Sequence, residues 1–174
     1  MSAKVDLKNH IRNIPDFPKP GIQFKDITTL LGNKNAFKLA VNQIAAKYKN
    51  KKIDAVVAVE ARGFILGGAL AHKLGVSFVP VRKKGKLPWR THSVTYDLEY
   101  GTDTLEMHHD ALKANNRVLI VDDLLATGGT VKAVTDLIRQ QQAKIIGIAF
   151  LIELTDLKGK EKLAGYPVYS LIKY

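Results

Sequence analysis

Residues 117–130 read RVLIVDDLLATGGT, and they carry the strongest structural signal in the chain. The first five residues form an apolar run, which predicts a strand that is buried on both faces. Two aspartates, a turn of small residues and a predicted helix follow. The apolar residues of this helix recur on one face, at Val131, Val134, Leu137 and Ile138. A buried strand that leads through a short loop into a helix is typical of an α/β fold.

The chemistry of this segment favours a phosphorylated sugar as ligand. Asp122 and Asp123 are expected to leave the strand end side by side, where they can accept hydrogen bonds from two neighbouring hydroxyls, as in a ribose diol. The turn after them has little bulk, and its backbone N–H groups can surround a phosphate at the positive end of the next helix. This turn comprises Ala126, Thr127, Gly128, Gly129 and Thr130. The phosphate-binding patterns G-x-x-x-x-G-K-[ST] and G-x-G-x-x-G do not occur in the sequence.

The rest of the chain alternates between the same two kinds of pattern. Apolar runs predict strands, and segments with one apolar face predict helices. We expect strands at 53–59, 77–81, 117–121, 144–152 and 168–172, helices at 4–13, 34–49, 63–74 and 129–141, and a hairpin at 98–107. The predicted fold is α/β, with a mostly parallel central sheet flanked by helices. Ligands bind beyond the carboxyl ends of the strands in such sheets.

Composition limits the class of protein. The chain has 174 residues, which fits one domain, and a net charge of +11, which favours polyanions such as nucleic acid or phosphorylated ligands. It has no cysteine, which excludes disulfides, thiolate zinc sites and a cysteine nucleophile, and suits a reducing compartment. No segment reaches the roughly 18 apolar residues of a membrane-spanning helix. We therefore expect a cytoplasmic protein without a membrane partner.

Several segments, in order along the chain, resemble the type I phosphoribosyltransferase family. Residues 122–130 are similar to that family's signature for phosphoribosyl pyrophosphate, in the form found in its adenine-specific members. The other matching segments are IPDFPKPGIQFKDITTLL (14–31), EARGF (60–64), RKKGKLP (82–88), YDLEYG (96–101) and ELTDLKGKEKL (153–163). The resemblance implies a purine salvage enzyme that transfers the 5-phosphoribosyl group from phosphoribosyl pyrophosphate to adenine N9 and gives AMP and pyrophosphate. It also implies Mg²⁺, held mainly by substrate oxygens and water, and a homodimer.

The same resemblance implies roles for individual residues. Asp122 and Asp123 would hold the ribose hydroxyls, and residues 126–130 the 5′-phosphate. Pyrophosphate would be bound by Glu60, Ala61, Arg62, Arg82, Lys83 and Lys86. Residues 1–32 would form an N-terminal helix and a hood over the base, in which Gln23, Phe24 and Lys25 bind adenine. A flexible lid would span 83–95, and Glu99 would act as the acid/base at purine N7.

Other interpretations remain open. Read without the resemblance, Glu99 is an ordinary solvated glutamate and the basic run at 82–86 an ordinary loop. A phosphoribosyltransferase for hypoxanthine, xanthine or orotate is the first rival. Relatives that act on 6-oxopurines have an aspartate where this chain has Ala126, which argues against them. The second rival is a nucleic-acid-binding regulator that senses phosphoribosyl pyrophosphate, although the chain has no added helix-turn-helix. The adjacent His108 and His109 should point to opposite faces of a strand, so we expect no zinc site.

Overall fold

The computed structural model describes residues 6–97 and 101–174. Its contacts divide the chain into two compact units, Met1–Gln43 and Ile44–Tyr174, and each unit is described by itself. The expectation of a single domain therefore stays a prediction.

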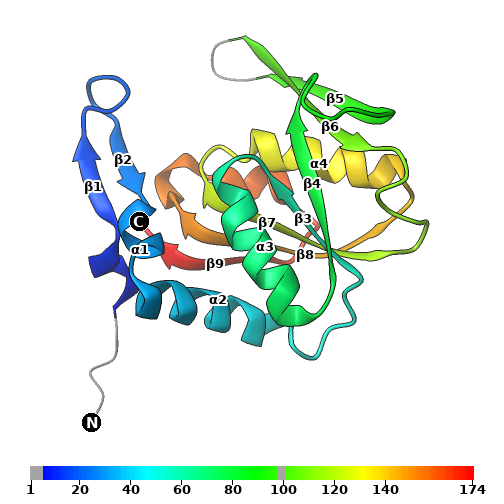
Figure 1. The fold of residues 1–174 in the computed structure, drawn as a ribbon. Helices are drawn as coiled ribbons and strands as arrows, with labels where there is room; N and C mark the ends of the chain where they lie inside the picture. The colour runs from blue at the N-terminus through cyan, green and yellow to red at the C-terminus, as the bar shows by residue number, and fades with distance from the viewer. Residues whose placement is uncertain (1–5, 98–100) are drawn as a thin grey trace. The chain divides into compact units, whose positions relative to one another are not determined.

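A seven-stranded sheet forms the centre of the second unit, with strand order β5-β6-β4-β3-β7-β8-β9 (Figure 1). Its strands are β3 (Ala55–Val59), β4 (Ser77–Lys83), β5 (Thr91–Asp97), β6 (Thr102–His108), β7 (Arg117–Leu125), β8 (Lys144–Glu153) and β9 (Val168–Lys173). The five strands β4, β3, β7, β8 and β9 are parallel, whereas β6 pairs antiparallel with both β4 and β5. This arrangement confirms the predicted α/β fold with a mostly parallel sheet.

Helices cover both faces of this sheet, which explains why β3 is apolar along its whole length. The helices are α3 (Arg62–Leu74) and α4 (Gly129–Gln140), and η2 (Thr155–Leu157) and η3 (Gly159–Leu163) are short 3₁₀ turns. Val57 and Val59 pack in the same core cluster as the buried residues of α4. Ala58, on the opposite side of β3, lies against α3 at Gly67. The predicted inward face of α4, at residues 131, 134, 137 and 138, is confirmed because all four side chains are buried.

The first unit contains η1 (Leu7–His10), β1 (Arg12–Pro15), β2 (Gln23–Asp26), α1 (Thr28–Leu31) and the start of α2 (Lys34–Tyr48). The predicted helix at 4–13 is wrong in its second half, because β1 begins at Arg12 and pairs antiparallel with β2. Hydrogen bonding to a partner strand outweighs local helix preference there. Asn33 caps α2, since its Oδ1 accepts from the backbone N–H groups of Asn35 (3.1 Å) and Ala36 (3.0 Å).

Two boundaries near the site differ from the prediction. β7 does not end at Val121 but continues to Leu125, because it stays paired with β8 as far as Leu125 opposite Glu153. The aspartates at 122 and 123 therefore lie within a strand and do not leave its end as expected.

The hairpin also begins earlier than predicted, with Thr91–Asp97 paired to Thr102–His108. Residues 91–95 of the predicted lid thus belong to β5, in which the β-branched residues Thr91, Val94 and Thr95 suit a strand. Among the described residues, no helix has the length and apolar character needed to cross a membrane.

Candidate functional site

A small cavity lies where β7 turns into α4. Its volume is about 80 Å³, and it is lined by Asp122 and residues 124–131. A single water needs roughly 10–15 Å³ on this measure, so the cavity can hold a group of several heavy atoms. We call residues 126–130 the phosphate loop. Its Gly128 has φ +80°, a left-handed conformation that places the following N–H groups at the start of α4. No side chain in the described part of the chain caps this helix start, so its N–H groups are available to an anion.

The two aspartates are held against the first turn of α3. Arg62 Nε lies 2.8 Å from Asp123 Oδ2, and the carboxylate of Asp122 accepts a hydrogen bond from the Asp123 N–H at 2.9 Å. A Cβ atom at Gly63 would lie only 2.7 Å from Asp122 Oδ1, so a bare backbone is required at this contact. We call Asp122 and Asp123 the acid pair. The structure therefore brings the acid pair together with Arg62, one of the residues predicted to bind pyrophosphate.

Burying the two carboxylates of the acid pair side by side lowers the stability of the folded protein. This burial raises the pKa of Asp122 well above its ordinary value, and the neighbouring charge of Asp123 raises it further. Burial also raises the pKa of Asp123, although the Arg62 guanidinium opposes the shift. Two close carboxylates with raised pKa values are typical of a site shaped for a ligand, which can supply the hydrogen-bond donors that the pair lacks.

Glu60 holds the side chain of one predicted pyrophosphate-binding cation, Arg82, and the backbone of another, Lys83. Its Oε2 accepts from Arg82 Nε (3.1 Å) and Nη2 (2.9 Å), and its Oε1 accepts from the Lys83 N–H at 2.6 Å. Burial alone would raise the pKa of Glu60, but these hydrogen bonds and the charge of Arg82 lower it overall. Ala61 joins Glu60, through a cis peptide bond, to the start of α3. Glu60 thus orients the Arg82 guanidinium and fixes the backbone at Lys83.

The turn after β4 holds the remaining cations. Lys83 Nζ pairs with Asp103 Oδ2 at 2.9 Å, and the Lys86 carbonyl accepts from Arg82 Nη1 at 3.2 Å. Inside the turn, the buried Glu106 accepts from the Gly85 N–H at 3.0 Å. Neither Asp103 nor Glu106 has a role predicted from the sequence, because a strand glutamate or aspartate gives no local signal until its partner strand is known.

The end of β5 lies beside the phosphate loop. Tyr96 Oη lies 3.4 Å from Thr130 Oγ1, and a Cβ atom at Gly129 would lie 3.7 Å from the Asp97 carbonyl oxygen. Glu99, the predicted acid/base, lies outside the described residues. The contact between Tyr96 and Thr130 was not predicted, because the hairpin was expected to begin at residue 98 and begins at Thr91.

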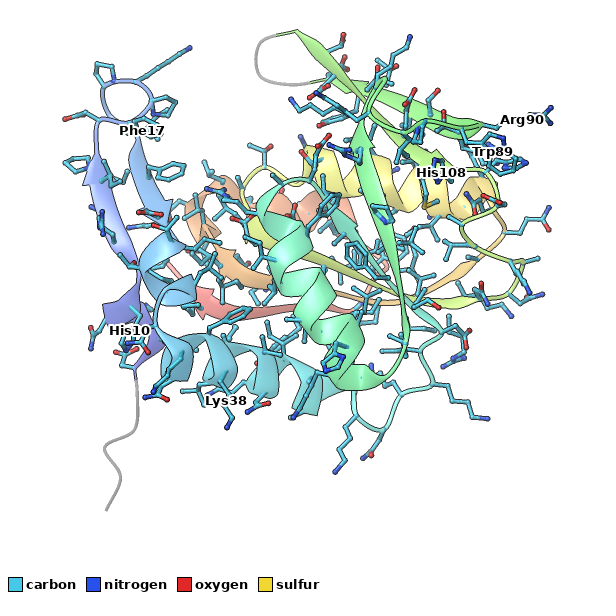
Figure 2. All side chains as sticks on the ribbon, viewed as in Figure 1. His10, Phe17, Lys38, Trp89, Arg90 and His108 are labelled. Carbon is cyan, nitrogen blue, oxygen red and sulfur yellow. The ribbon has the colours of Figure 1, made fainter. Side chains whose placement is uncertain are left out.

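The predicted adenine-binding residues lie on β2 of the first unit and are described apart from the phosphate loop. Asn13 connects two of them, because its Nδ2 donates to Gln23 Oε1 (2.7 Å) and its Oδ1 accepts from Lys25 Nζ (2.9 Å). Phe24 packs edge-on against Phe17, with ring centroids 5.1 Å apart. Figure 2 shows Phe17 at the loop that joins β1 to β2.

Trp89 lies on the surface of the second unit, just before β5. Trp89 is 55% exposed and packs edge-on against His109, and Figure 2 shows it beside Arg90 near the start of β5. Trp89 is therefore a surface residue within the segment predicted to form the lid. In residues 6–97 and 101–174, no three His, Asp or Glu side chains form a group that could hold a metal ion.

The raised pKa of Asp122 predicts that Asp122→Asn stabilises the free protein near neutral pH. The folded state holds this proton more tightly than the unfolded chain. The stability that this tighter proton binding gives the folded state is therefore complete below the unfolded pKa. It is lost as the pH rises through the raised pKa of the folded state. An amide carries no charge, so the variant should gain about 1 kcal/mol or more, or roughly 2–4 °C in Tm per kcal/mol. Thermal unfolding across pH measures this, and the gain should vanish below about pH 4.

The control for this prediction is Asp110→Asn, which removes the charge of an exposed aspartate and should leave Tm within about 1 °C. A lower Tm for Asp122→Asn near neutral pH, with the control unchanged, would contradict the buried-charge explanation.

Comparison with known proteins extends the likeness over the whole chain. A model of the phosphoribosyl transferase domain matches residues 28–172. An adenine phosphoribosyltransferase of Clostridium kluyveri is 58% identical over 170 residues, which are 98% of this chain and 99% of that protein. The crystal structure of adenine phosphoribosyltransferase from Thermoanaerobacter pseudethanolicus is 53% identical, with a TM-score of 0.94 over 97% of this chain and 98% of that one.

A third relative was solved with ligands. It is the adenine phosphoribosyltransferase of Saccharomyces cerevisiae, complexed with D-2,5-dideoxy-2,5-imino-altritol 1,6-bisphosphate and adenine. It is 40% identical, with a TM-score of 0.90 over 95% of this chain and 96% of that one. The fold, the acid pair with its phosphate loop, and identities of this size over nearly the full length agree: the chain belongs to the phosphoribosyltransferase family, among its adenine phosphoribosyltransferases.

Proposed function

We infer that this chain transfers the 5-phosphoribosyl group of phosphoribosyl pyrophosphate to N9 of adenine and releases AMP and pyrophosphate. The observation that carries this conclusion is the cavity lined by Asp122 and the start of α4, in a chain 58% identical to an adenine phosphoribosyltransferase. The reaction belongs to purine salvage.

The phosphate loop is the proposed site of the 5′-phosphate. Its backbone N–H groups lie at the start of α4, where the helix dipole favours negative charge. The hydroxyls of Thr127 and Thr130 line the same cavity and can donate further hydrogen bonds. The ribose hydroxyls of the same ligand would then donate to Asp122 and Asp123. This explains why two carboxylates are kept close together in a buried place.

The proposed pyrophosphate site consists of cations that are already oriented by carboxylates. Arg62 is held by Asp123, Arg82 by Glu60 and Lys83 by Asp103. Lys86 is exposed on the same turn. Groups that are fixed before the ligand arrives lose less conformational entropy on binding, and they stabilise the charge that develops on the leaving group.

Membership of this family implies a requirement for a divalent metal, and we propose that the metal is Mg²⁺. The oxygen donors of the acid pair suit this ion, which prefers hard oxygen ligands and keeps much of its water. Asp122 and Asp123 would contact the ion or its water shell, and most of its ligands would be substrate oxygens. When bound, Mg²⁺ neutralises charge on the departing pyrophosphate.

The remaining assignments are also proposals. Gln23, Phe24 and Lys25 would bind adenine. The segment 83–95 would close over the ligands, its first part as the turn after β4 and its last residues as the start of β5. The basic, cysteine-free chain would act in the cytoplasm as a homodimer. Adenine and phosphoribosyl pyrophosphate would be its partners, with no role for nucleic acid or membrane.

The base specificity of this reaction is testable with a panel of bases. We expect kcat/KM for adenine to exceed that for hypoxanthine by at least ~100-fold, because a site built for one set of polar edges leaves buried groups unpaired with another base. Ala126 lines the phosphate cavity without a carboxylate that could serve a 6-oxopurine. The assay contains phosphoribosyl pyrophosphate, Mg²⁺ and adenine, hypoxanthine, guanine, xanthine or orotate in turn. Equal turnover of adenine and hypoxanthine would overturn the adenine assignment.

The proposed acid/base, Glu99, follows Asp97 by two residues, and Asp97 lies against the phosphate loop. In the N7–H tautomer of adenine the N9 lone pair is free to bond to the sugar as pyrophosphate leaves, and a carboxylate at N7 can accept the N7 proton. We expect Glu99→Gln to lower kcat by roughly 10²- to 10⁴-fold, because this is the usual contribution of general acid–base catalysis. Binding of phosphoribosyl pyrophosphate, measured by calorimetry, should change little.

The matched control is Glu161→Gln, since Glu161 is an exposed glutamate in η3. Glu106→Gln is unsuitable as a control because Glu106 holds the turn after β4. If Glu99→Gln keeps full kcat across the pH range, Glu99 is not the proton acceptor, and stabilisation of the sugar cation and the leaving group carries the reaction.

A further inference from the structure

Gly159 packs its backbone directly against the phosphate loop. A Cβ atom at Gly159 would overlap the carbonyl oxygen of Ala126 and lie 2.9 Å from a side-chain carbon of Leu125. In the other direction, a Cβ atom at Gly128 would overlap the carbonyl oxygen of Gly159. The two stretches of backbone therefore touch where β7 gives way to α4, and neither glycine has room for a side chain.

The segment that carries Gly159 is fixed at its start, middle and end. The Thr155 N–H and hydroxyl donate to the carbonyl of Tyr174 at 2.9 and 2.6 Å. Lys160 Nζ lies 2.7 Å from Glu153 Oε2, and this glutamate is buried at the end of β8. Leu163 closes the segment with a side chain that is 1% exposed in the core. These contacts hold residues 155–163 in place, and we call this segment the support. A side chain added at Gly159 could therefore not be accommodated by movement of the support.

The phosphate loop lies between this support and the cavity. Residues 124–131 line the cavity, and Ala126 and Gly128 of the same loop touch Gly159. Added bulk at Gly159 would push these two residues toward the cavity, or turn their peptide groups. Either movement displaces the N–H groups that face a bound phosphate.

We propose that Gly159 is a positioning residue for the 5′-phosphate of the substrate, acting through the backbone of Ala126 and Gly128. This proposal rests on the proposed function, because it takes the phosphate loop as the site of that phosphate. It also gives a role to the segment ELTDLKGKEKL, which neither the acid pair nor the cations explain.

The test is Gly159→Ala, with KM for phosphoribosyl pyrophosphate, KM for adenine, and the Kd of ribose 5-phosphate measured by calorimetry. We expect KM for phosphoribosyl pyrophosphate and the Kd to rise on the order of 10- to 100-fold, since a displacement near 1 Å at a positioned group has effects of this size. KM for adenine should change less than about threefold, because only the phosphate end of the site is displaced.

Gly147→Ala is the matched control. A Cβ atom at Gly147 would lie 2.9 Å from a ring carbon of Tyr48, so this variant also crowds a packed contact. Gly147 lies six residues before Glu153 on β8, roughly 20 Å from the loop. The control should lower Tm as Gly159→Ala does but leave both KM values and the Kd unchanged, so a merely destabilised fold is distinguished from a misplaced loop.

Lys160→Met provides a second variant in case Gly159→Ala does not fold. It removes the ion pair that anchors the segment on β8, and it should raise the Kd of ribose 5-phosphate by roughly 3- to 10-fold. An unchanged Kd in folded Gly159→Ala, or in Lys160→Met if the first variant is unfolded, overturns the proposal. Wild-type protein that neither forms AMP nor binds ribose 5-phosphate would instead contradict the proposed function.

Discussion

The contact between the acid pair and the first turn of α3 is the constraint on which the second unit depends. Arg62 pairs with Asp123, and Gly63 leaves space for the carboxylate of Asp122. Burial raises the pKa of both aspartates, so holding them together opposes folding. Other interactions of β7 offset this unfavourable free energy. The strand is paired on both sides, with β3 and β8, and its apolar residues 118–121 are fully buried.

The same arrangement explains how charges are distributed around the site. Each predicted pyrophosphate-binding cation with a described partner is matched by a carboxylate: Arg62 by Asp123, Arg82 by Glu60 and Lys83 by Asp103. Such pairs fix long side chains before a ligand arrives, and a polyanion can then compete for the cations. The overall charge of +11 strengthens the attraction for a ligand that carries several phosphates.

Local sequence predicted most of the fold, because its main elements have strong local signals. The helices predicted at 34–49 and 63–74 and the strand predicted at 53–59 agree with α2, α3 and β3 to within two residues at each end. The predicted boundaries are wrong where pairing between distant segments determines them. These places are β1 against β2, the extension of β7 along β8, and the start of the hairpin at Thr91. Likewise, the sequence indicated the acid pair and the phosphate loop, which are contiguous. It gave no sign of Glu106 or Gly159, whose roles depend on contacts across the fold.

The central claim is that one ligand places its phosphate in the loop at the start of α4 and its ribose hydroxyls on the acid pair. A crystal structure of the protein with AMP tests this most directly. The account predicts the phosphorus atom in the cavity lined by residues 124–131, with both ribose hydroxyls within about 3.2 Å of carboxylate oxygens of Asp122 and Asp123. A phosphate bound elsewhere, with this cavity filled by water alone, would contradict it.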